Sequence, residues 1–200
     1  MIDKIKESLW RQFGASIDML ENVIVMSPED FLHENKQFFY IIFHNLIFLD
    51  YYLTIPPKDF IPKLPFTIKE ADEIPQEAID DLIPDRIFSK TELLDYLKQC
   101  REKGYQIIHT LTEDKLNDRF IEDLDTDAMD YPVLEILLYN MRHVQHHTGQ
   151  LNLLLRQNVH QSPKWVFRAK DETLIWPGRP GGPKKRLTRN VDTVIAQKNR

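Results

Sequence analysis

The sequence is poor in the features that mark secreted, membrane-spanning or disulfide-rich proteins. Cys100 is alone among the 200 residues, so no intramolecular disulfide can form. The longest apolar run, residues 38–53, is broken by polar residues and falls short of the roughly 20 apolar residues that span a bilayer. The N-terminal stretch, residues 1–13, contains acids and lacks the basic-then-apolar layout of a signal peptide. These absences predict a cytoplasmic protein with no membrane partner.

Motifs of several enzyme classes are also missing. No Glu-x-x-His occurs in the chain, which excludes the paired motifs of a di-iron helical bundle. The His-Glu-x-x-His motif of zinc proteases and the Gly-x-Ser-x-Gly motif of serine hydrolases are absent as well. Basic residues near Cys100 could lower the pKa of its thiol. Because no local motif supports a nucleophile, we interpret this residue as a structural thiol.

The net charge of −5 is divided unevenly along the chain. Residues from Trp176 onward carry seven Lys and Arg and one acid, a charge of +6, whereas the preceding residues carry 19 bases and 30 acids, a charge of −11. An acidic body argues against nucleic acid as the main partner. The basic tail could bind a phosphate-bearing partner, but a solvated arm lying on the acidic body is the simpler interpretation.

Apolar periodicity predicts four helices and an all-α fold. Apolar residues recur at three- and four-residue steps over 2–26, and the run 35–53 is apolar almost all round, as in a helix buried within a bundle. The third helix begins with a capping box formed by Ser89 and Glu92. The fourth spans about 132–157. We expect the four to form a four-helix bundle.

The second and third helices are joined by a long connection. Residues 55–88, here called the crossing segment, hold six of the twelve prolines and show little periodicity. A connection of this length allows a crossover between parallel helices, and we expect one here. Two minor elements complete the expectation: a short helical piece starting at Pro28 and a strand-like stretch at 118–124.

Three histidines lie within five residues of the fourth helix. At about 100° per residue, His143, His146, His147 and Gln150 fall within an arc of about 100° on one helix face. Either the i,i+3 or the i,i+4 histidine pair could bind one ion, and neutral imidazoles suit zinc, nickel or ferrous iron. A catalytic metal site needs a third ligand from elsewhere.

His44 is the candidate for that third ligand. It lies midway along the apolar second helix, where a lone histidine is most often a hydrogen-bonded core residue. A buried histidine on one helix and inward-facing imidazoles on another are jointly explained by a metal ion. From the residues alone, ordinary packing stays open as the alternative.

Several segments resemble the DinB-like superfamily. HVQHHTGQLNLLLRQ at 143–157 is similar to its His-x-x-x-His-x-Gly-Gln signature, and YIIFHNLIFLDYYL at 40–53 resembles its second helix, which carries a single histidine. The stretches at 11–24 and 89–103 are also similar to members of this group. The resemblance extends over roughly the first 168 residues. It implies a four-helix bundle domain at 1–168, followed by an irregular basic tail at 169–200.

The resemblance also implies a set of metal ligands. Carried onto this chain, they are His44, His143 and His147. His147 is preferred to the histidine before it because it directly precedes the TGQ sequence of the signature. Gly149 is expected to permit close helix approach, and Gln150 to orient a ligand by a hydrogen bond.

Characterised members of the superfamily include metal-dependent thiol transferases and isomerases that use bacillithiol, mycothiol or glutathione. The resemblance therefore implies one divalent ion (zinc, nickel or iron), a low-molecular-weight thiol and a small-molecule substrate, with a homodimer allowed for. A hydrolase would use water in place of the thiol. A non-catalytic metal- or ligand-binding bundle is the alternative. A substrate-sized pocket with a polar group beside the ion would distinguish an enzyme from a binding protein. Asp50 and Tyr51 are candidates for that polar group.

Overall fold

The computed structural model describes residues 1–122 and 128–169. The chain divides into a compact unit at 1–170 and a second unit at 171–200. Apart from Ala169, the expected basic tail lies outside the described residues, so its boundary stays a prediction.

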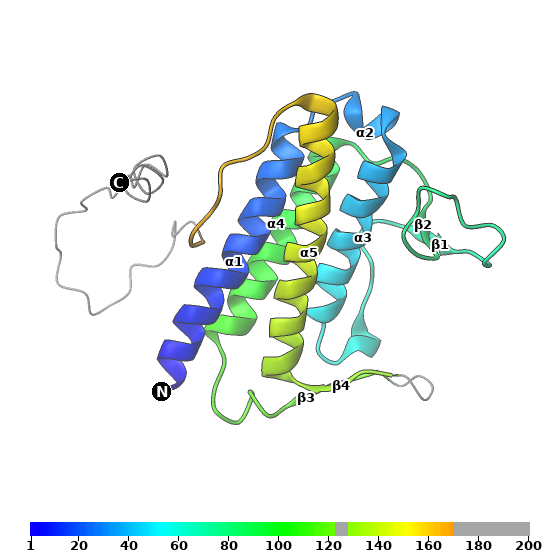
Figure 1. Ribbon diagram of the computed structural model, residues 1–200. Helices are drawn as coiled ribbons and strands as arrows, with labels where there is room; N and C mark the ends of the chain where they lie inside the picture. The colour runs from blue at the N-terminus through cyan, green and yellow to red at the C-terminus, as the bar shows by residue number, and fades with distance from the viewer. Residues whose placement is uncertain (123–127, 170–200) are drawn as a thin grey trace, which may run out of the picture. The chain divides into compact units, whose positions relative to one another are not determined.

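Most of the described chain is helical, which confirms the all-α expectation in outline (Figure 1). The long helices begin and end within a few residues of the positions expected from the apolar periodicity. The short helical piece begins three residues later than expected, because Asp30, not Ser27, is its N-cap. The helices are α1 Ile2–Met26, α2 Phe31–Glu34, α3 Lys36–Tyr52, α4 Lys90–His109 and α5 Val133–Val159.

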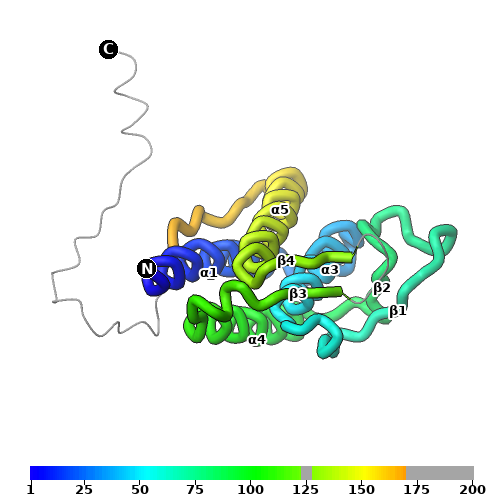
Figure 2. Tube along the Cα trace, turned by 90° about the horizontal axis from the view of Figure 1, so that it is seen from below, coloured from blue at the N-terminus to red at the C-terminus, as the bar shows by residue number. Residues whose placement is uncertain are grey.

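The four long helices lie side by side, with α1 and α3 each packed against both α4 and α5 (Figures 1 and 2). α3 and α5 run antiparallel, since Asn45 donates to the Val144 carbonyl at 3.4 Å while Asn140 donates to the Leu49 carbonyl at 3.0 Å. α3 and α4 run in the same direction (Figure 1). The crossing segment therefore joins two helices that run in the same direction.

Local sequence explains where α3 and α4 begin and why α3 is buried. The Ser89 side chain accepts from the Glu92 backbone N–H, and the Glu92 carboxylate accepts from the Ser89 N–H, which is the expected capping box. Asn35 caps α3 by accepting from the Phe38 N–H at 2.9 Å. Eleven residues of α3 are buried, which confirms the expectation that a helix apolar almost all round is buried among its neighbours.

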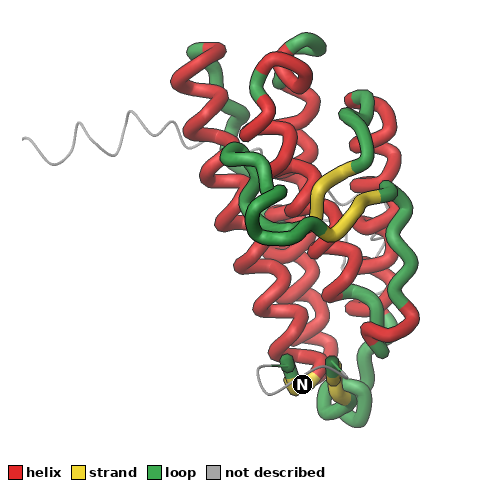
Figure 3. Tube along the Cα trace, turned by 90° about the vertical axis from the view of Figure 1, so that its right-hand side faces the viewer, coloured by secondary structure: helices red, strands yellow, loops and turns green. Residues whose placement is uncertain are grey.

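Two short antiparallel strand pairs decorate the helices. β1 Phe66–Ile68 pairs with β2 Leu82–Pro84 inside the crossing segment, on the outer side of the helices, and β2 contacts α3 (Figure 3). β3 Arg119–Ile121 pairs with β4 Asp130–Pro132 at the start of α5. β3 lies within the strand-like stretch at 118–124 that the sequence indicated, of which residues 123–124 lie outside the described residues. The first pair was not expected, because three-residue strands carry too little alternation to be recognised.

None of the described helices is both long enough and apolar enough to cross a bilayer.

Candidate metal centre

The structure brings His44, His143 and His147 together between α3 and α5. One ring nitrogen from each lies within 4.8 Å of the others. The Nε2 atoms of His44 and His143 are 3.0 Å apart, and the His147 ring centroid lies 4.5 Å from each of the other two. The antiparallel pairing of the two helices produces this arrangement, because residues before His44 on α3 face residues after His143 on α5. Their role as metal ligands stays a prediction.

Hydrogen bonds fix the orientation of two of the three rings. His44 Nδ1 contacts the Asp80 carboxylate, which can only accept, so Nδ1 carries the proton and Nε2 faces His143. His147 Nδ1 lies 2.8 Å from Gln150 Oε1, which likewise leaves Nε2 with a free lone pair. This contact agrees with the orienting role expected for Gln150. Both arrangements are typical of metal-binding histidines, whose second nitrogen donates to an oxygen.

The environment keeps the His143 and His147 rings neutral. Burial, followed by the neighbouring imidazoles of His147, His44 and His146, lowers the pKa of His143 from 6.5 to about 3. Burial, followed by His44, lowers the pKa of His147 to about 4, although the bond to Gln150 acts in the opposite direction. A neutral imidazole offers a lone pair, which is the form that binds a divalent cation.

The spacing of the nitrogens fits one divalent ion. Two nitrogens that each lie about 2.0–2.1 Å from one ion are separated by about 2.8–3.4 Å for bond angles between 90° and tetrahedral. The 3.0 Å between His44 Nε2 and His143 Nε2 falls in that interval. If His44 carries its proton on Nδ1, the contact between the two Nε2 atoms is a hydrogen bond only when His143 carries its proton on Nε2. That proton must move to His143 Nδ1 before both Nε2 lone pairs can face an ion. Within the described residues His143 Nδ1 is buried without a hydrogen-bond partner.

His146 and Gly149, also on α5, bear on two further expectations. His146 is exposed and stacks edge-on against His147 at 4.9 Å, but it is not part of the cluster. The close approach expected at Gly149 is wrong, because a Cβ built there would meet nothing within 4 Å. Glycine at this position is therefore not required by helix packing.

Asp50 and Tyr51 do not serve the histidine cluster. Asp50 faces α4, where its carboxylate accepts from the Tyr96 hydroxyl at 2.7 Å and from Lys103 Nζ at 2.5 Å. The Tyr51 hydroxyl donates to Glu122 at 2.7 Å. Asp50 is 8 % exposed, so it is not the solvated charge that its position near the helix end would suggest.

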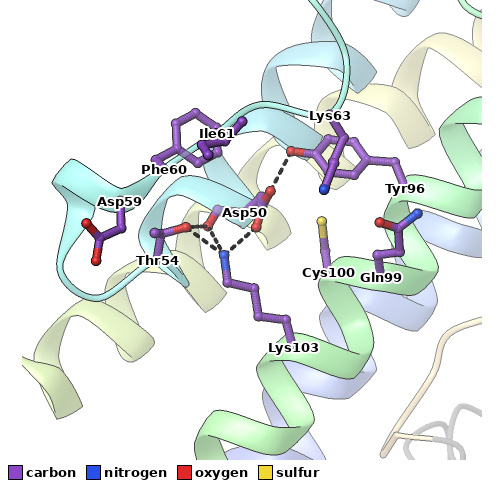
Figure 4. Close-up of a pocket in the computed structure, with 10 residues that line it drawn as sticks. All are labelled: Asp50, Thr54, Asp59, Phe60, Ile61, Lys63, Tyr96, Gln99, Cys100 and Lys103. Carbon is purple, nitrogen blue, oxygen red and sulfur yellow. Dashed lines mark hydrogen bonds and ion pairs between the residues drawn. The ribbon is translucent and has the colours of Figure 1, made fainter.

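Asp50 lies instead at the floor of a separate cavity of about 270 Å³ between α3, α4 and the start of the crossing segment (Figure 4). Lys103 Nζ also donates to the Thr54 hydroxyl at 2.6 Å and to the Asp50 carbonyl at 3.1 Å, so all three of its protons are used. The sulfur of Cys100 points toward the cavity (Figure 4). Burial raises the pKa of this thiol and keeps it neutral, which agrees with a structural thiol.

A smaller cavity of about 210 Å³ adjoins the histidine cluster. It is lined by Tyr139, Arg142, His143 and His146. The Arg142 guanidinium lies 5.4 Å from the centre of the Tyr139 ring. A small molecule held there would contact the His143 ring and a cationic group together.

Asp80 is the residue of this centre that sequence reasoning missed. It lies 36 positions after His44, within the crossing segment, where it is one acid among many. No spacing rule relates it to the helices, since the path of an irregular connection decides which carboxylate reaches the ring. A capping or helical pattern could not have identified it.

Comparison with known families supports part of this centre. The sequence model of the DinB family matches residues 84–174. That stretch contains α4 and α5, and with them His143 and His147, whereas His44 lies before it. No curated protein and no solved structure gives a significant match. The inclusion of His44 therefore rests on its position beside the two α5 histidines.

Proposed function

We propose that this chain, which belongs to the DinB-like superfamily through its match over residues 84–174, binds one divalent metal ion through His44, His143 and His147. The observation that carries the proposal is the convergence of the three imidazoles, with the Nδ1 atoms of His44 and His147 held by oxygen acceptors. The arrangement of the four long helices is then a four-helix bundle of the type found in this superfamily.

We further propose that the centre is catalytic and acts on a small molecule together with a low-molecular-weight thiol. A divalent ion bound there would act as a Lewis acid that lowers the pKa of a thiol or of water. The protein would hold the three neutral imidazoles in place and orient the reactants in the cavity beside His143. Tyr139 and Arg142 would line the path of the substrate. The Tyr139 ring would make apolar contacts with it, and the Arg142 guanidinium would interact with it through its charge.

In thiol transfer, the thiol sulfur forms a bond to an electrophilic carbon, the leaving group departs with the bonding electrons, and the thiol proton passes to solvent. Three converging histidines among the described residues favour an enzyme over a structural metal site, because a structural site would be closed by a fourth protein ligand. Zinc, nickel and iron(II) are all compatible with three imidazole nitrogens.

The first experiment measures bound metal. Purified protein, its His44→Ala variant and its His146→Ala variant are incubated with zinc, nickel or iron(II), desalted and analysed for metal content. We expect one ion per chain in the wild type and in His146→Ala, and less than a tenth of that in His44→Ala. Equal metal content in all three would contradict the site.

The second experiment measures turnover. The metal-loaded wild type is assayed for conjugation of low-molecular-weight thiols with aryl halides and epoxides, with His44→Ala as the control. Turnover that disappears with His44 supports metal-centred thiol transfer. Equal rates in both proteins would exclude it. Metal binding without turnover across the panel would favour the non-catalytic metal-binding protein.

A further inference from the structure

A carboxylate from outside the helices reaches the proposed centre. Asp80 Oδ2 contacts His44 Nδ1, and Asp80 Oδ1 accepts from the Leu82 backbone N–H at 3.1 Å. Leu82 is the first residue of β2, the strand of the crossing segment that contacts α3. The side chains of His44 and Asp80 are 13 % and 21 % exposed, so the contact is largely shielded from solvent. Both carboxylate oxygens are thus engaged, one with the ring and one with the strand.

We propose that Asp80 is a positioning residue of the metal centre, which fixes the orientation of His44 and makes ion affinity depend on attachment of the crossing segment to α3. The inference rests on the proposed function, since it assigns a role to a residue behind one of the three ligands. Asp80 contacts His44 at Nδ1, whereas His143 lies at Nε2 of the same ring. Asp80 is not one of the three residues whose ligand atoms converge.

The orienting effect follows from the chemistry of the imidazole ring. A neutral ring has one N–H and one lone pair, and an ionised carboxylate can only accept. Asp80 therefore places the proton on His44 Nδ1 and leaves the Nε2 lone pair directed at the centre. The negative charge also increases the electron donation of the ring to a bound cation. Within the described residues, Asp80 is the carboxylate in hydrogen-bond contact with one of the three rings.

The coupling to the crossing segment follows from the position of Asp80. Its carboxylate is held by the backbone of β2, and β2 pairs with β1 in the register Ile68 to Leu82. If the strand pair moves away from α3, the carboxylate leaves His44 and the ring becomes free to rotate or to change tautomer. An ion that requires His44 Nε2 therefore also favours the attached position of the strand pair.

Asp81 provides a matched control. It is the neighbouring acid, and its backbone carbonyl accepts from the Lys69 N–H at 2.9 Å. Its side chain makes no contact with His44 among the interactions of the described residues. Asp81→Asn thus removes the same charge, one residue away, without touching the ring. Asp80→Asn keeps a neutral acceptor, Asp80→Glu keeps the charge, and Asp80→Ala keeps neither.

The experiment has three readouts on full-length protein. Zinc affinity is measured by competition with a chelator, the tautomer of His44 by ¹⁵N NMR of the zinc-free protein, and the Leu82 amide by hydrogen exchange. We expect Asp80→Ala to weaken zinc binding by about 10–100-fold. The variant should also lose the Nδ1–H form of His44 and speed exchange at Leu82. Asp80→Asn should lie between Asp80→Ala and the wild type, Asp80→Glu should restore most of the affinity, and Asp81→Asn should match the wild type.

The outcomes separate positioning from simple anchoring of the strand pair. Faster exchange at Leu82 with an unchanged tautomer and unchanged zinc affinity would overturn the proposal, because Asp80 would then be an anchor alone. Asp80→Asn keeps the fold testable if Asp80→Ala unfolds. A wild type that binds no zinc would refute the proposed function. The ring tautomer of the zinc-free protein would still decide whether Asp80 orients His44.

Discussion

His44 Nε2 lies 3.0 Å from His143 Nε2, although 99 residues separate them in the chain. The contact joins two antiparallel helices that are also linked by apolar packing and by hydrogen bonds from Asn45 and Asn140 to backbone carbonyls. Two partly buried imidazoles this close cannot both be protonated without strong repulsion. The pair can therefore share either a proton or an ion, and burial keeps the His143 ring in the neutral form that binds an ion.

Metal binding is expected to stabilise the folded protein. An ion that binds only the folded state adds about 2.7 kcal/mol of stability at a concentration 100 times its Kd. The melting temperature of the wild type should rise when zinc or nickel is added and fall again with a chelator. His143→Ala should abolish most of this rise, as measured by differential scanning fluorimetry.

His146→Ala is the control for that measurement, because its ring is exposed and lies outside the cluster. It should keep most of the metal-induced rise. If both variants lost the rise equally, the choice of His147 over His146 as a ligand would be wrong.

The metal-free protein should lose stability as the pH falls. His143 and His147 have pKa values near 3 and 4 in the folded state and 6.5 as the reference for the unfolded chain. Since the folded pKa values are lower, the unfolded state binds more protons below pH 6.5, so stability declines from about pH 6.5 down to pH 3. Both rings are partly exposed, so we expect a loss of about 2 kcal/mol between pH 7 and pH 5. Urea denaturation with a chelator present measures it.

The titratable groups that face these two rings are His44, His146 and Asp80, and they remain in a variant in which His143 and His147 are both replaced by Asn. That double variant should show a clearly shallower dependence of unfolding free energy on pH over the same interval. An unchanged slope would assign the pH dependence to other groups.

The helices were largely predictable because each is specified by local signals. The stripe over 2–26 and the Ser89 capping box act through residues three or four positions apart, and α1 and α4 begin and end close to the expected residues. The residues alone placed His143, His146 and His147 on one helix face and His44 on a buried helix. The choice of His44, His143 and His147 as a set came from the resemblance to the DinB-like signature.

The contacts made by the crossing segment and by Asp50 could not be predicted in the same way. Asp80 reaches His44 through the path of an irregular connection, which no periodicity encodes. Asp50 was placed with His44 by counting helical turns, but six residues along a helix correspond to about 240°, so the two side chains leave α3 on different sides. Its actual partners lie on α4, which counting along one helix cannot reveal.

The Asp50–Lys103 pair should matter for stability and not for metal binding. Lys103→Met leaves a carboxylate that is 11 % exposed with the Tyr96 hydroxyl as its remaining side-chain donor. Removing one partner of a buried ion pair costs about 3 kcal/mol or more, and the 34 % exposure of Lys103 places the expectation near 2–3 kcal/mol. Urea denaturation measures the loss. Zinc affinity should stay at the wild-type value.

Lys98→Met is the matched control on α4, because Lys98 is exposed; we expect a change within about 0.5 kcal/mol. Replacing Asp50 by Asn together with Lys103→Met should recover much of the loss, since no buried charge then remains unpaired. If Lys103→Met and Lys98→Met had the same stability, the network at the cavity floor would contribute nothing to folding.

Gly149→Ala should make the protein more stable, in contrast to what the family signature suggests. Gly149 lies inside α5, is exposed, and a Cβ there would meet nothing within 4 Å, so alanine adds helix propensity without a clash. The expected gain is about 0.5–1 kcal/mol in the free energy of unfolding. Gly14→Ala is the comparison, because its Cβ would lie 2.7 Å from the Cβ of Ala169 and the gain in propensity would be offset by the clash. Zinc affinity of Gly149→Ala should equal that of the wild type. A loss of stability or of zinc affinity in Gly149→Ala would contradict the open surroundings of this glycine.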